Sequence, residues 1–289
     1  MSGFELVAAD TRGVTELHEA NLAAFSDYIA GPLKLTLDQW PSLMGRQGID
    51  LAQSRVAVRD GAVVAYAYAC PRVESGRWRL AIMGATPAAR GTGAAPALLD
   101  DFLARAQAAG MGAAELECFA LNERALRLYR SRGFDVVCPL NAWKSPGVPT
   151  PARDASLARE VSPLAREEAF AWLAEANARV DMLPFPNTHF SQAAQTRPLT
   201  FWQCDDALIT FSVVEGTPTQ IHGLVDLDPS LRGAETLARA LRQAHPDAFA
   251  PPLLRDDLGG AALARAGFEL GALNQVLMSL PLQASTPEP

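Results

Sequence analysis

One stretch, residues 80–99, most constrains what this chain can fold into. It reads LAIMGATPAARGTGAAPALL: an apolar run ends at Thr86-Pro87, a turn rich in glycine and alanine follows, and a helical pattern begins at Pro96. Glycine lets the backbone come close to a ligand, and the first amides of a helix have no acceptor within the helix. A strand, a glycine turn and a helix start in this order therefore predict a site for an anion.

Two other kinds of phosphate-binding turn compare poorly with this stretch. A P-loop needs a lysine after its last glycine, and this turn contains no lysine. A dinucleotide fingerprint G-x-G-x-x-G would start at Gly91, but Pro96 stands at its third glycine and the turn comes late in the chain. Because Glu115 is at a tolerable distance for a ribose contact, this interpretation stays open, as does an ordinary strand-to-helix turn without a ligand.

Charge and composition exclude several classes of protein. The 289 residues carry a formal net charge of −7 without a basic cluster, which argues against nucleic-acid binding. The length fits two average domains. The four cysteines form no C-x-x-C pair and the four histidines have no metal-ligand spacing, so we expect reduced thiols and no metal. Without a signal-peptide pattern or an apolar run of roughly 20 residues, we expect a soluble, cytoplasmic protein.

The hydrophobic pattern up to residue 144 predicts an α/β (α+β) domain. Hairpins come first and strand–helix units later, which is typical of a mixed, mostly antiparallel sheet flanked by helices. The expected strands are 4–9, 55–58, 62–69, 78–86, 114–119, 134–137 and 142–144, and the expected helices are 11–29, 36–44, 97–109 and 122–132.

The same order restarts after a segment rich in Pro, Ser and Ala. Helical patterns at 162–180 and 237–241 and strands at 199–204, 207–214 and 220–226 follow it. The segment from Pro87 to Gly91 aligns with that from Pro229 to Gly233, and Gly133-Phe134 aligns with Gly267-Phe268, which indicates an internal repeat. We expect a first domain at 1–144, a linker at 145–158, a second domain at 159–282 and a disordered tail at 283–289.

Two motifs resemble those of the GNAT superfamily of N-acetyltransferases. Arg90-x-x-Gly93-x-Ala95 matches the family's Arg/Gln-x-x-Gly-x-Gly/Ala turn. The second signature is matched by Leu116-Glu117-Cys118, Asn122, Ala125, Leu128-Tyr129 and Gly133-Phe134, with Cys118 where Val is usual. The resemblance covers residues 4–144. It implies two tandem acetyltransferase (GNAT) folds, acetyl-CoA as the acetyl donor, and direct transfer within a ternary complex.

The chemistry of the residues agrees with a coenzyme A site. Open amides of the turn and the helix dipole suit a pyrophosphate, and the amide-rich pantetheine arm could pair with the strand that ends at Ala85. We expect Gly84 to mark a bulge that opens the sheet, and Asn122 to cap the next helix and contact the arm. The expected cofactor-binding residues are Met83, Ala85, Arg90, Gly91, Thr92, Gly93, Ala94, Ala95 and Asn122.

The resemblance also implies catalytic roles. Tyr129 stands where the family places the acid that protonates the leaving thiolate. Glu117 is the candidate base, at the spacing from Tyr129 found in ribosomal-protein alanine acetyltransferases; a water relay and a merely structural ion pair are the alternatives. Asp27, Tyr28 and Tyr66 are expected to contact the acceptor, because a carboxylate beside aromatic rings suits a cationic amine.

The second copy departs from the signatures at the positions that bind the cofactor. Glu235 replaces Gly93, Leu237 replaces Ala95 and Leu263 replaces Tyr129, so the second domain is expected to be degenerate. The sequence thus predicts an N-acetyltransferase, active in its first half, acting on a primary amine of a small molecule or a peptide N-terminus. A homodimer stays open, and the alternative function is a non-catalytic CoA-binding sensor or interaction module.

Overall fold

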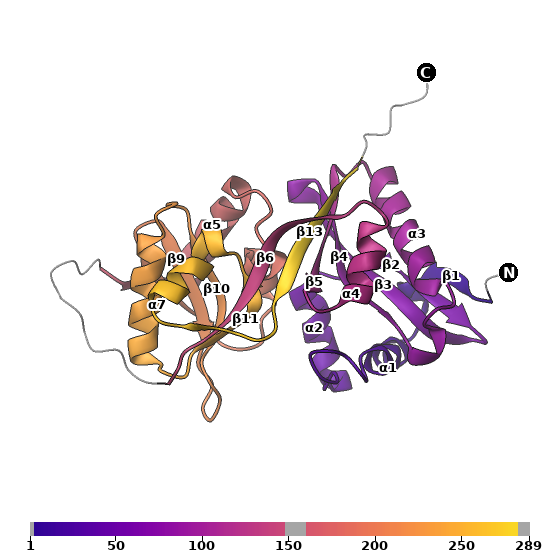
Figure 1. Ribbon diagram of the computed structural model, residues 1–289, viewed down its shortest axis with the longest axis horizontal. Coiled ribbons are helices and arrows are strands. Elements are labelled where there is room, and N and C mark those ends of the chain that lie inside the picture. The colour runs from indigo at the N-terminus through magenta and orange to yellow at the C-terminus, as the bar shows by residue number, and fades with distance from the viewer. Residues whose placement is uncertain (1–2, 148–159, 283–289) are drawn as a thin grey trace, which may run out of the picture. The chain divides into compact units, whose positions relative to one another are not determined.

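The chain divides into two compact units in the computed structural model, which describes residues 3–147 and 160–282 (Figure 1). The first unit contains the residues up to Val137 and again those from Leu277 onward, and the second contains Cys138–Val276. Each has a mostly antiparallel sheet flanked by helices, which confirms the predicted fold class. Most of the expected linker and the whole tail at 283–289 lie outside the described residues.

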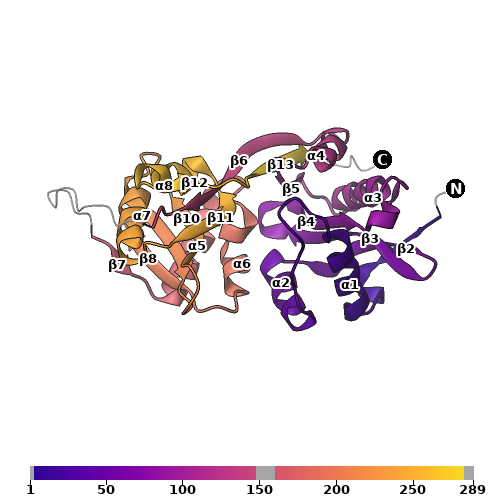
Figure 2. The ribbon, with the colours of Figure 1, turned by 60° about the horizontal axis from the view of Figure 1, so that its bottom comes forward.

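The sheet of the first unit has the order β1-β2-β3-β4-β5-β13. Helices α1 and α2 lie on one face of this sheet and α3 and α4 on the other (Figure 2). The first face buries Leu17, Trp40 and Tyr68 beneath α1 and α2, and α3 buries Leu98 and Phe102. The elements are β1 (Glu5–Ala8), α1 (Val14–Ala24), α2 (Trp40–Gln47), β2 (Asp50–Arg59), β3 (Ala62–Arg72), β4 (Arg77–Ala85), α3 (Ala94–Ala108), β5 (Ala113–Phe119), α4 (Glu123–Arg130) and β13 (Gln275–Pro281).

Strands β4 and β5 are parallel, and they part halfway along their length. Their last pair is Leu80 with Leu116. The register of β3 against β4 shifts at the same point, where Ala81 is the extra residue. The bulge therefore lies at Ala81 and not at Gly84 as expected. Gly84 has a different function, because a Cβ atom there would lie 2.5 Å from the hydroxyl oxygen of Tyr66.

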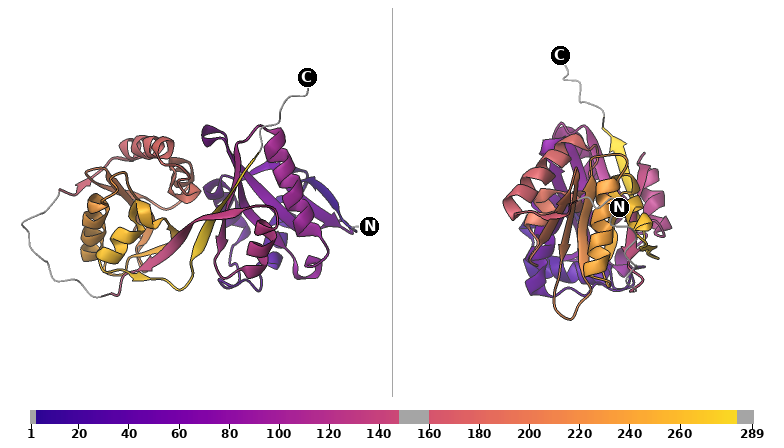
Figure 3. Two further views of the ribbon diagram at one scale, coloured as in Figure 1. Left: turned by 45° about the horizontal axis from the view of Figure 1, so that its top comes forward. Right: turned by 90° about the vertical axis from the view of Figure 1, so that its left-hand side faces the viewer.

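The sheet of the second unit has the order β6-β11-β10-β9-β8-β7, with β12 also paired to β6. Helices α5 and α7 lie on different faces, as the salmon and orange helices of Figure 3 show. The elements are β6 (Asp135–Lys144), β7 (Ser162–Pro163), α5 (Arg166–Arg179), α6 (His189–Ala193), β8 (Thr200–Cys204), β9 (Ala207–Ser212), β10 (Gln220–Asp226), α7 (Arg232–Ala244), β11 (Phe249–Leu254), a π-helical turn (Asp256–Gly260), α8 (Ala261–Arg265) and β12 (Glu269–Leu270).

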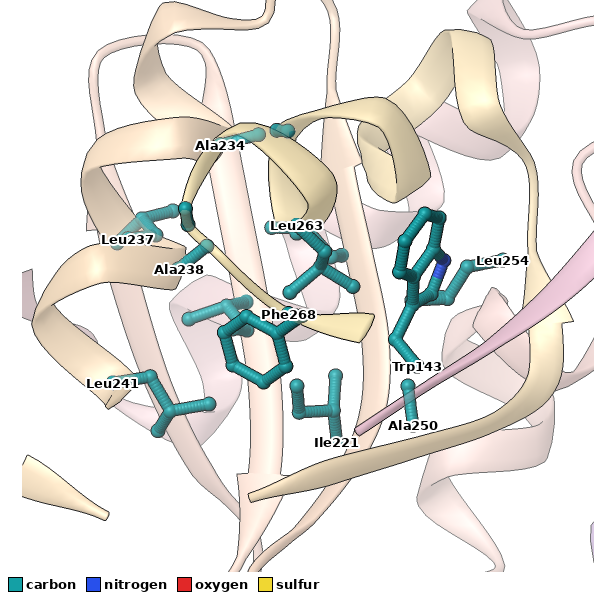
Figure 4. Close-up of a cluster of buried hydrophobic side chains, with 14 of the residues drawn as sticks. Trp143, Ile221, Ala234, Leu237, Ala238, Leu241, Ala250, Leu254, Leu263 and Phe268 are labelled. Atoms are coloured by element: carbon teal, nitrogen blue, oxygen red, sulfur yellow. The ribbon is translucent and has the colours of Figure 1, made fainter. Parts of the chain in front are cut away.

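The two units exchange strands, so their boundaries differ from the expected cut after residue 144. The predicted strands 134–137 and 142–144 form one strand, β6, whose later half pairs with β11 and β12 of the second unit. Trp143 of β6 packs into the second unit's core (Figure 4). Conversely, β13 lies beside β5, and Ser279 Oγ donates to the carbonyl of Ala114 at 3.3 Å. Hydropathy alone does not reveal such a partner, because the buried face of a strand has the same pattern in either sheet.

The internal repeat is confirmed at its second anchor. Gly133 and Gly267 both have positive φ, 89° and 83°, directly after a helix. In both units the amide of the next residue donates to the carbonyl of the equivalent helical residue: Phe134 N donates to Tyr129 O at 3.2 Å, and Phe268 N donates to Leu263 O at 3.0 Å. The superposition of Leu263 on Tyr129 that the sequence predicts therefore holds in the backbone.

The exchanged strand leads to a prediction about truncation. A chain that ends at Asn274 lacks β13, which buries Leu277 and Met278 almost completely. Each buried side chain of this size is worth roughly 2–5 kcal/mol, so the first unit should melt about 10 °C lower or fail to fold. Calorimetry measures this. A chain that ends at Leu282 is the control and should melt like the full-length protein; equal melting of the chain ending at Asn274 would contradict the exchange.

Candidate active site

A cavity of about 490 Å³ opens in the first unit, where β4 parts from β5. Its walls come from the end of α1 and the loop after it, the last residues of β4, the turn before α3, and α4. The lining residues are Ala24, Phe25, Asp27, Tyr28, Met83, Gly84, Ala85, Ala89, Arg90, Gly91, Gly93, Ala95, Pro96, Asn122, Arg124, Ala125, Leu128 and Tyr129. Most of the residues predicted for cofactor and catalysis thus share one cavity.

The turn before α3 exposes backbone amides to this cavity. Among the described residues, the amides of Gly91, Gly93, Ala94 and Ala95 donate no hydrogen bond. Gly91 and Gly93 have φ of 81° and 89°, and a Cβ atom at either position would meet no protein atom within 4 Å. Glycine is needed there for the backbone conformation, and the space that a side chain would enter is left for a ligand. Open amides at a helix start form an anion site.

Two of the amides that we expected to bind the cofactor are used within the turn. The amide of Arg90 donates to Pro87 O at 3.3 Å, and that of Thr92 donates to Ala89 O at 3.3 Å. The hydroxyl of Thr92 also donates to Ala89 O, and Thr92 does not line the cavity. Ala94 is buried and does not line the cavity either, although its amide is open. Fewer amides are therefore available to an anion than the sequence predicts, because the amides of Arg90 and Thr92 donate to carbonyl groups within the turn.

Tyr129 reaches the cavity from α4 and is 8% exposed. Its hydroxyl lies 4.0 Å from the sulfur of Met83 on β4. Burial raises its pKa far above the ordinary value, and the neighbouring Cys118 and Tyr28 act in the same direction. The phenol thus stays protonated at every physiological pH, which leaves it an O–H donor in an otherwise apolar part of the cavity.

Asn122 and Tyr28 lie together beside Tyr129. The side-chain oxygen of Asn122 accepts a hydrogen bond from Ala125 N at 3.2 Å, which confirms the predicted cap of α4. Burial raises the pKa of Tyr28 to about 12, and a hydrogen bond with Asn122 opposes this shift. The Tyr28 ring packs edge-on against Phe119, with 5.7 Å between ring centroids. This aromatic and aliphatic part of the cavity lining therefore carries three polar groups, the amide of Asn122 and the hydroxyls of Tyr28 and Tyr129.

Glu117 and Tyr66 are not brought to the cavity. Glu117 points to the opposite face of β5, where both its carboxylate oxygens accept hydrogen bonds from Arg79 at 2.9–3.1 Å. Arg79 is itself buried and also binds the backbone and side chain of Gln47. Tyr66 is fully buried against Gly84 and stacks on Tyr68 at 4.7 Å. A strand pattern predicts the face on which a side chain lies, but not the partner that holds it.

Sequence reasoning missed Arg124, Phe25 and Leu128. Arg124 and Leu128 are spaced by one helical turn on α4, as are Ala125 and Tyr129, so the helical period places all four on one face. That spacing could have identified the lining. Within residues 3–147 and 160–282, Arg124 forms no hydrogen bond or ion pair, whereas the cavity's other cation, Arg90, is paired with Asp27 at 2.6 Å. The cavity therefore presents one uncompensated positive charge.

The corresponding turn of the second unit is filled by the protein itself. Helix α7 begins at Arg232, directly after Leu231 with φ of 56°. One carboxylate oxygen of Asp226 accepts from Ala234 N and the other from Asp228 N, both at 2.9 Å. Gly233 lies inside the helix, where a Cβ atom would come 2.5 Å from Cys204 O. It is therefore a packing glycine and not the turn glycine that the alignment with Gly91 suggests.

The replaced side chains close the rest of the second turn. Glu235 forms ion pairs with Arg239 at 2.7 Å and Arg265 at 2.8 Å. Leu263 is fully buried in the hydrophobic core, where Tyr129 of the first unit reaches its cavity (Figure 4). The second unit thus keeps the shape of the fold, while one carboxylate accepts a helix-start amide and another adds an acidic, arginine-paired side chain to the first turn of α7.

Comparison with known proteins relates the first unit to a family and the whole chain to known folds. Residues 16–134 match the acetyltransferase (GNAT) family. A GCN5-related N-acetyltransferase from Sphaerobacter thermophilus aligns over 99% of both chains, with a TM-score of 0.67 and 16% identity. One from Anabaena variabilis aligns over 96% of this chain and 72% of its own, with a TM-score of 0.64 and 16% identity. Among curated proteins, none matches.

A tandem structure resembles the whole chain. A tandem GNAT protein from the clavulanic acid biosynthesis pathway aligns over 99% of this chain and all of its own, with a TM-score of 0.61 and 14% identity. Such identities establish the fold. The family match applies to residues 16–134 of the first unit, and the likeness of the whole chain to these structures shows a fold of two GNAT-type units in tandem.

The described part of the chain contains no group of three His, Cys, Asp or Glu side chains that could hold a metal ion. None of its helices combines the length and the apolar character that a membrane span requires.

The buried phenols lead to a prediction about alkaline pH. The chain has four tyrosines, all in the first unit, and burial raises the pKa of each. Below the unfolded value of about 10 both states keep these protons; above it only the native state does, so stability should fall as the pH rises further. Tyrosinate absorbance should therefore appear in one step together with loss of near-ultraviolet circular dichroism. Gradual ionisation near pH 10 in a folded protein would contradict this.

Proposed function

We propose that the first unit transfers the acetyl group of acetyl-CoA to a primary amine by direct attack within a ternary complex. One observation carries this proposal: the open amides of Gly91, Gly93 and Ala95 and the protonated hydroxyl of Tyr129 belong to residues that line the same cavity. An anion site alone would suit many ligands. An anion site joined to a buried O–H donor by an apolar channel suits a pyrophosphate at one end and a reacting thioester at the other.

The residues present fit coenzyme A. The four open amides and the positive end of the α3 dipole would hold the pyrophosphate, and Arg124 would add the uncompensated positive charge. Met83 and Ala85 belong to the part of β4 that has lost its partner β5, so their backbone groups are available to the amides of the pantetheine arm. When bound, acetyl-CoA supplies an activated acyl carbon and a thiol leaving group.

Tyr129 would donate its hydrogen bond to the leaving sulfur. Its raised pKa keeps the hydroxyl protonated, and the apolar surroundings strengthen a hydrogen bond to a developing negative charge. An amine must lose its own proton before it can attack, since an alkylamine has a pKa of about 10. Because Glu117 is held by Arg79 outside the cavity, the proposal assigns this deprotonation to water and gives Glu117 a structural role.

The residues that line the cavity also limit which form of the acceptor amine can bind. Among the described residues that line the cavity, Asp27 is the only acidic one, and Arg90 neutralises it. The acceptor is therefore proposed to enter as a neutral primary amine against the rings of Phe25 and Tyr28, and not as a cation held by a free carboxylate. A small polyamine, an aminoglycoside, an amino acid and a peptide N-terminus all carry the required group.

Thiol release from acetyl-CoA with a panel of amines tests the proposal. Tyr129→Phe should reduce kcat about 10²-fold, a typical contribution of one positioned proton donor, while CoA binding stays intact. Turnover of Tyr129→Phe equal to that of the native protein would remove Tyr129 from the chemistry. CoA binding without thiol release from any amine would favour the alternative, a non-catalytic CoA-binding module.

The same assay decides the role of Glu117. Glu117→Gln breaks a buried ion pair and should lower the melting temperature, at a cost of about 3–5 kcal/mol. The protein that remains folded should keep the rise of kcat/KM with pH that amine deprotonation produces. Loss of this acidic limb in Glu117→Gln would instead make Glu117 the base.

The charge of the turn provides a second test, based on Ala95. Ala95 lines the cavity in the first turn of α3, where Glu and Gln are both compatible with a helix start. Ala95→Glu should weaken CoA binding at least tenfold more than the isosteric Ala95→Gln, because only Glu repels phosphate. Titration calorimetry of the full chain should give one CoA per chain before substitution. Two equivalents, or equal effects of both substitutions, would contradict the assignment.

A further inference from the structure

Arg90 connects three segments that lie around the cavity. Its guanidinium donates to both carboxylate oxygens of Asp27 at 2.6 Å, to Ala24 O at 3.1 Å and to Ala85 O at 3.4 Å. These acceptors belong to the loop after α1, the last residue of α1 and the last residue of β4. A guanidinium has five N–H groups, and four of its hydrogen bonds are thus made within the protein.

This arrangement leaves Arg90 little capacity to bind an anion. Its charge is balanced by Asp27, and the pair raises the pKa of Arg90 and lowers that of Asp27. The neighbouring turn amides and Arg124 are the groups without acceptors. Although Arg90 lines the site, its guanidinium therefore holds protein segments together and does not serve as a ligand-binding group.

The segment held by Arg90 forms one wall of the cavity. Residues 25–36 contain no helix or strand, and Phe25, Asp27 and Tyr28 of this segment line the cavity. The rings of Phe25 and Tyr28 meet edge-on at 4.6 Å. At its far end, Leu35 O lies 2.8 Å from Nε2 of the buried His18. Near the cavity, the only ion pair of the described segment is the one between Asp27 and Arg90.

We propose that Asp27 and Arg90 are positioning residues that fix this wall, and with it the binding of the acceptor amine, against the turn that holds the donor. This inference rests on the proposed acetyl transfer. It assigns the pair to acceptor affinity and not to CoA affinity. A bidentate pair fixes both distance and orientation, so its loss allows the Phe25–Tyr28 wall to move while the amides of the turn keep their geometry.

Two neutral variants of the full chain, Asp27→Asn and Arg90→Gln, test the proposal. Each should raise KM for the amine about three- to tenfold, as expected for a partly exposed charged pair, with CoA affinity changed less than about twofold. The double variant should be no worse than either single variant, because the two residues act as one unit. Asp27→Glu, which keeps the charge, should recover much of the acceptor affinity.

A second exposed bidentate pair gives the matched control. Arg132 donates to both oxygens of Asp100 at 2.8 and 3.0 Å, and neither residue lines the cavity. Asp100→Asn should therefore leave KM for the amine unchanged. Amide hydrogen exchange in residues 25–36 should accelerate in Asp27→Asn and Arg90→Gln alike, and not in Asp100→Asn.

The opposite assignment predicts a different pattern. If Arg90 binds phosphate, Arg90→Gln should weaken CoA about tenfold, while Asp27→Asn should leave it unchanged or tighten it by removing a negative charge. That result would overturn the proposal, as would unchanged hydrogen exchange in both variants. CoA titration and hydrogen exchange need no turnover, so absence of acetyl transfer would contradict the proposed function without obscuring the role of the pair.

Discussion

The first unit depends on backbone amides that its own turn leaves without acceptors. Those of Gly91, Gly93 and Ala95 belong to residues that line the cavity at the start of α3, and the positive φ of Gly91 and Gly93 favours glycine, which has no side chain to enter that space. At the start of α7, Gly233 packs against Cys204 O, and the carboxylate of Asp226 accepts from the amide of Ala234. Open amides beside a cavity at a helix start favour an anion, whereas a helix start packed against the protein only begins a helix. This difference separates two units that share one fold.

The separation of β4 from β5 opens a cavity beside the open amides, in which the reacting groups are proposed to lie. The parallel ladder with β5 ends after Leu80, beside the bulge at Ala81. Met83 and Ala85 stay paired with β3 and line the cavity on the side where β5 has parted. Helix α4 then brings Tyr129 to that cavity, because Asn122 fixes where the helix begins. Turn, bulge and helix cap are each local features, and the proposed site for a phosphate-bearing thioester rests on their combination.

The sequence was sufficient where function depends on backbone conformation and on position along one element. Glycines with positive φ, the Asn122 cap and the return of Phe134 and Phe268 to their helices are local, and their residue types predict them. Long-range partners were not predictable in this way. The contact of Glu117 with Arg79, the closing of the second turn by Asp226 and the exchange of strands between units depend on segments far apart in the chain, which periodicity does not join.

Amide chemical shifts measured during a CoA titration of the full chain test the central claim most directly. Hydrogen bonding to a phosphate shifts a backbone amide, and only unsatisfied amides can form such a bond. The account predicts the largest changes at Gly91, Gly93 and Ala95, with the amides of Ala234 and Glu235, which already donate to Asp226 and to Leu231 O, unchanged. Changes centred on the start of α7, or none at the turn before α3, would contradict it.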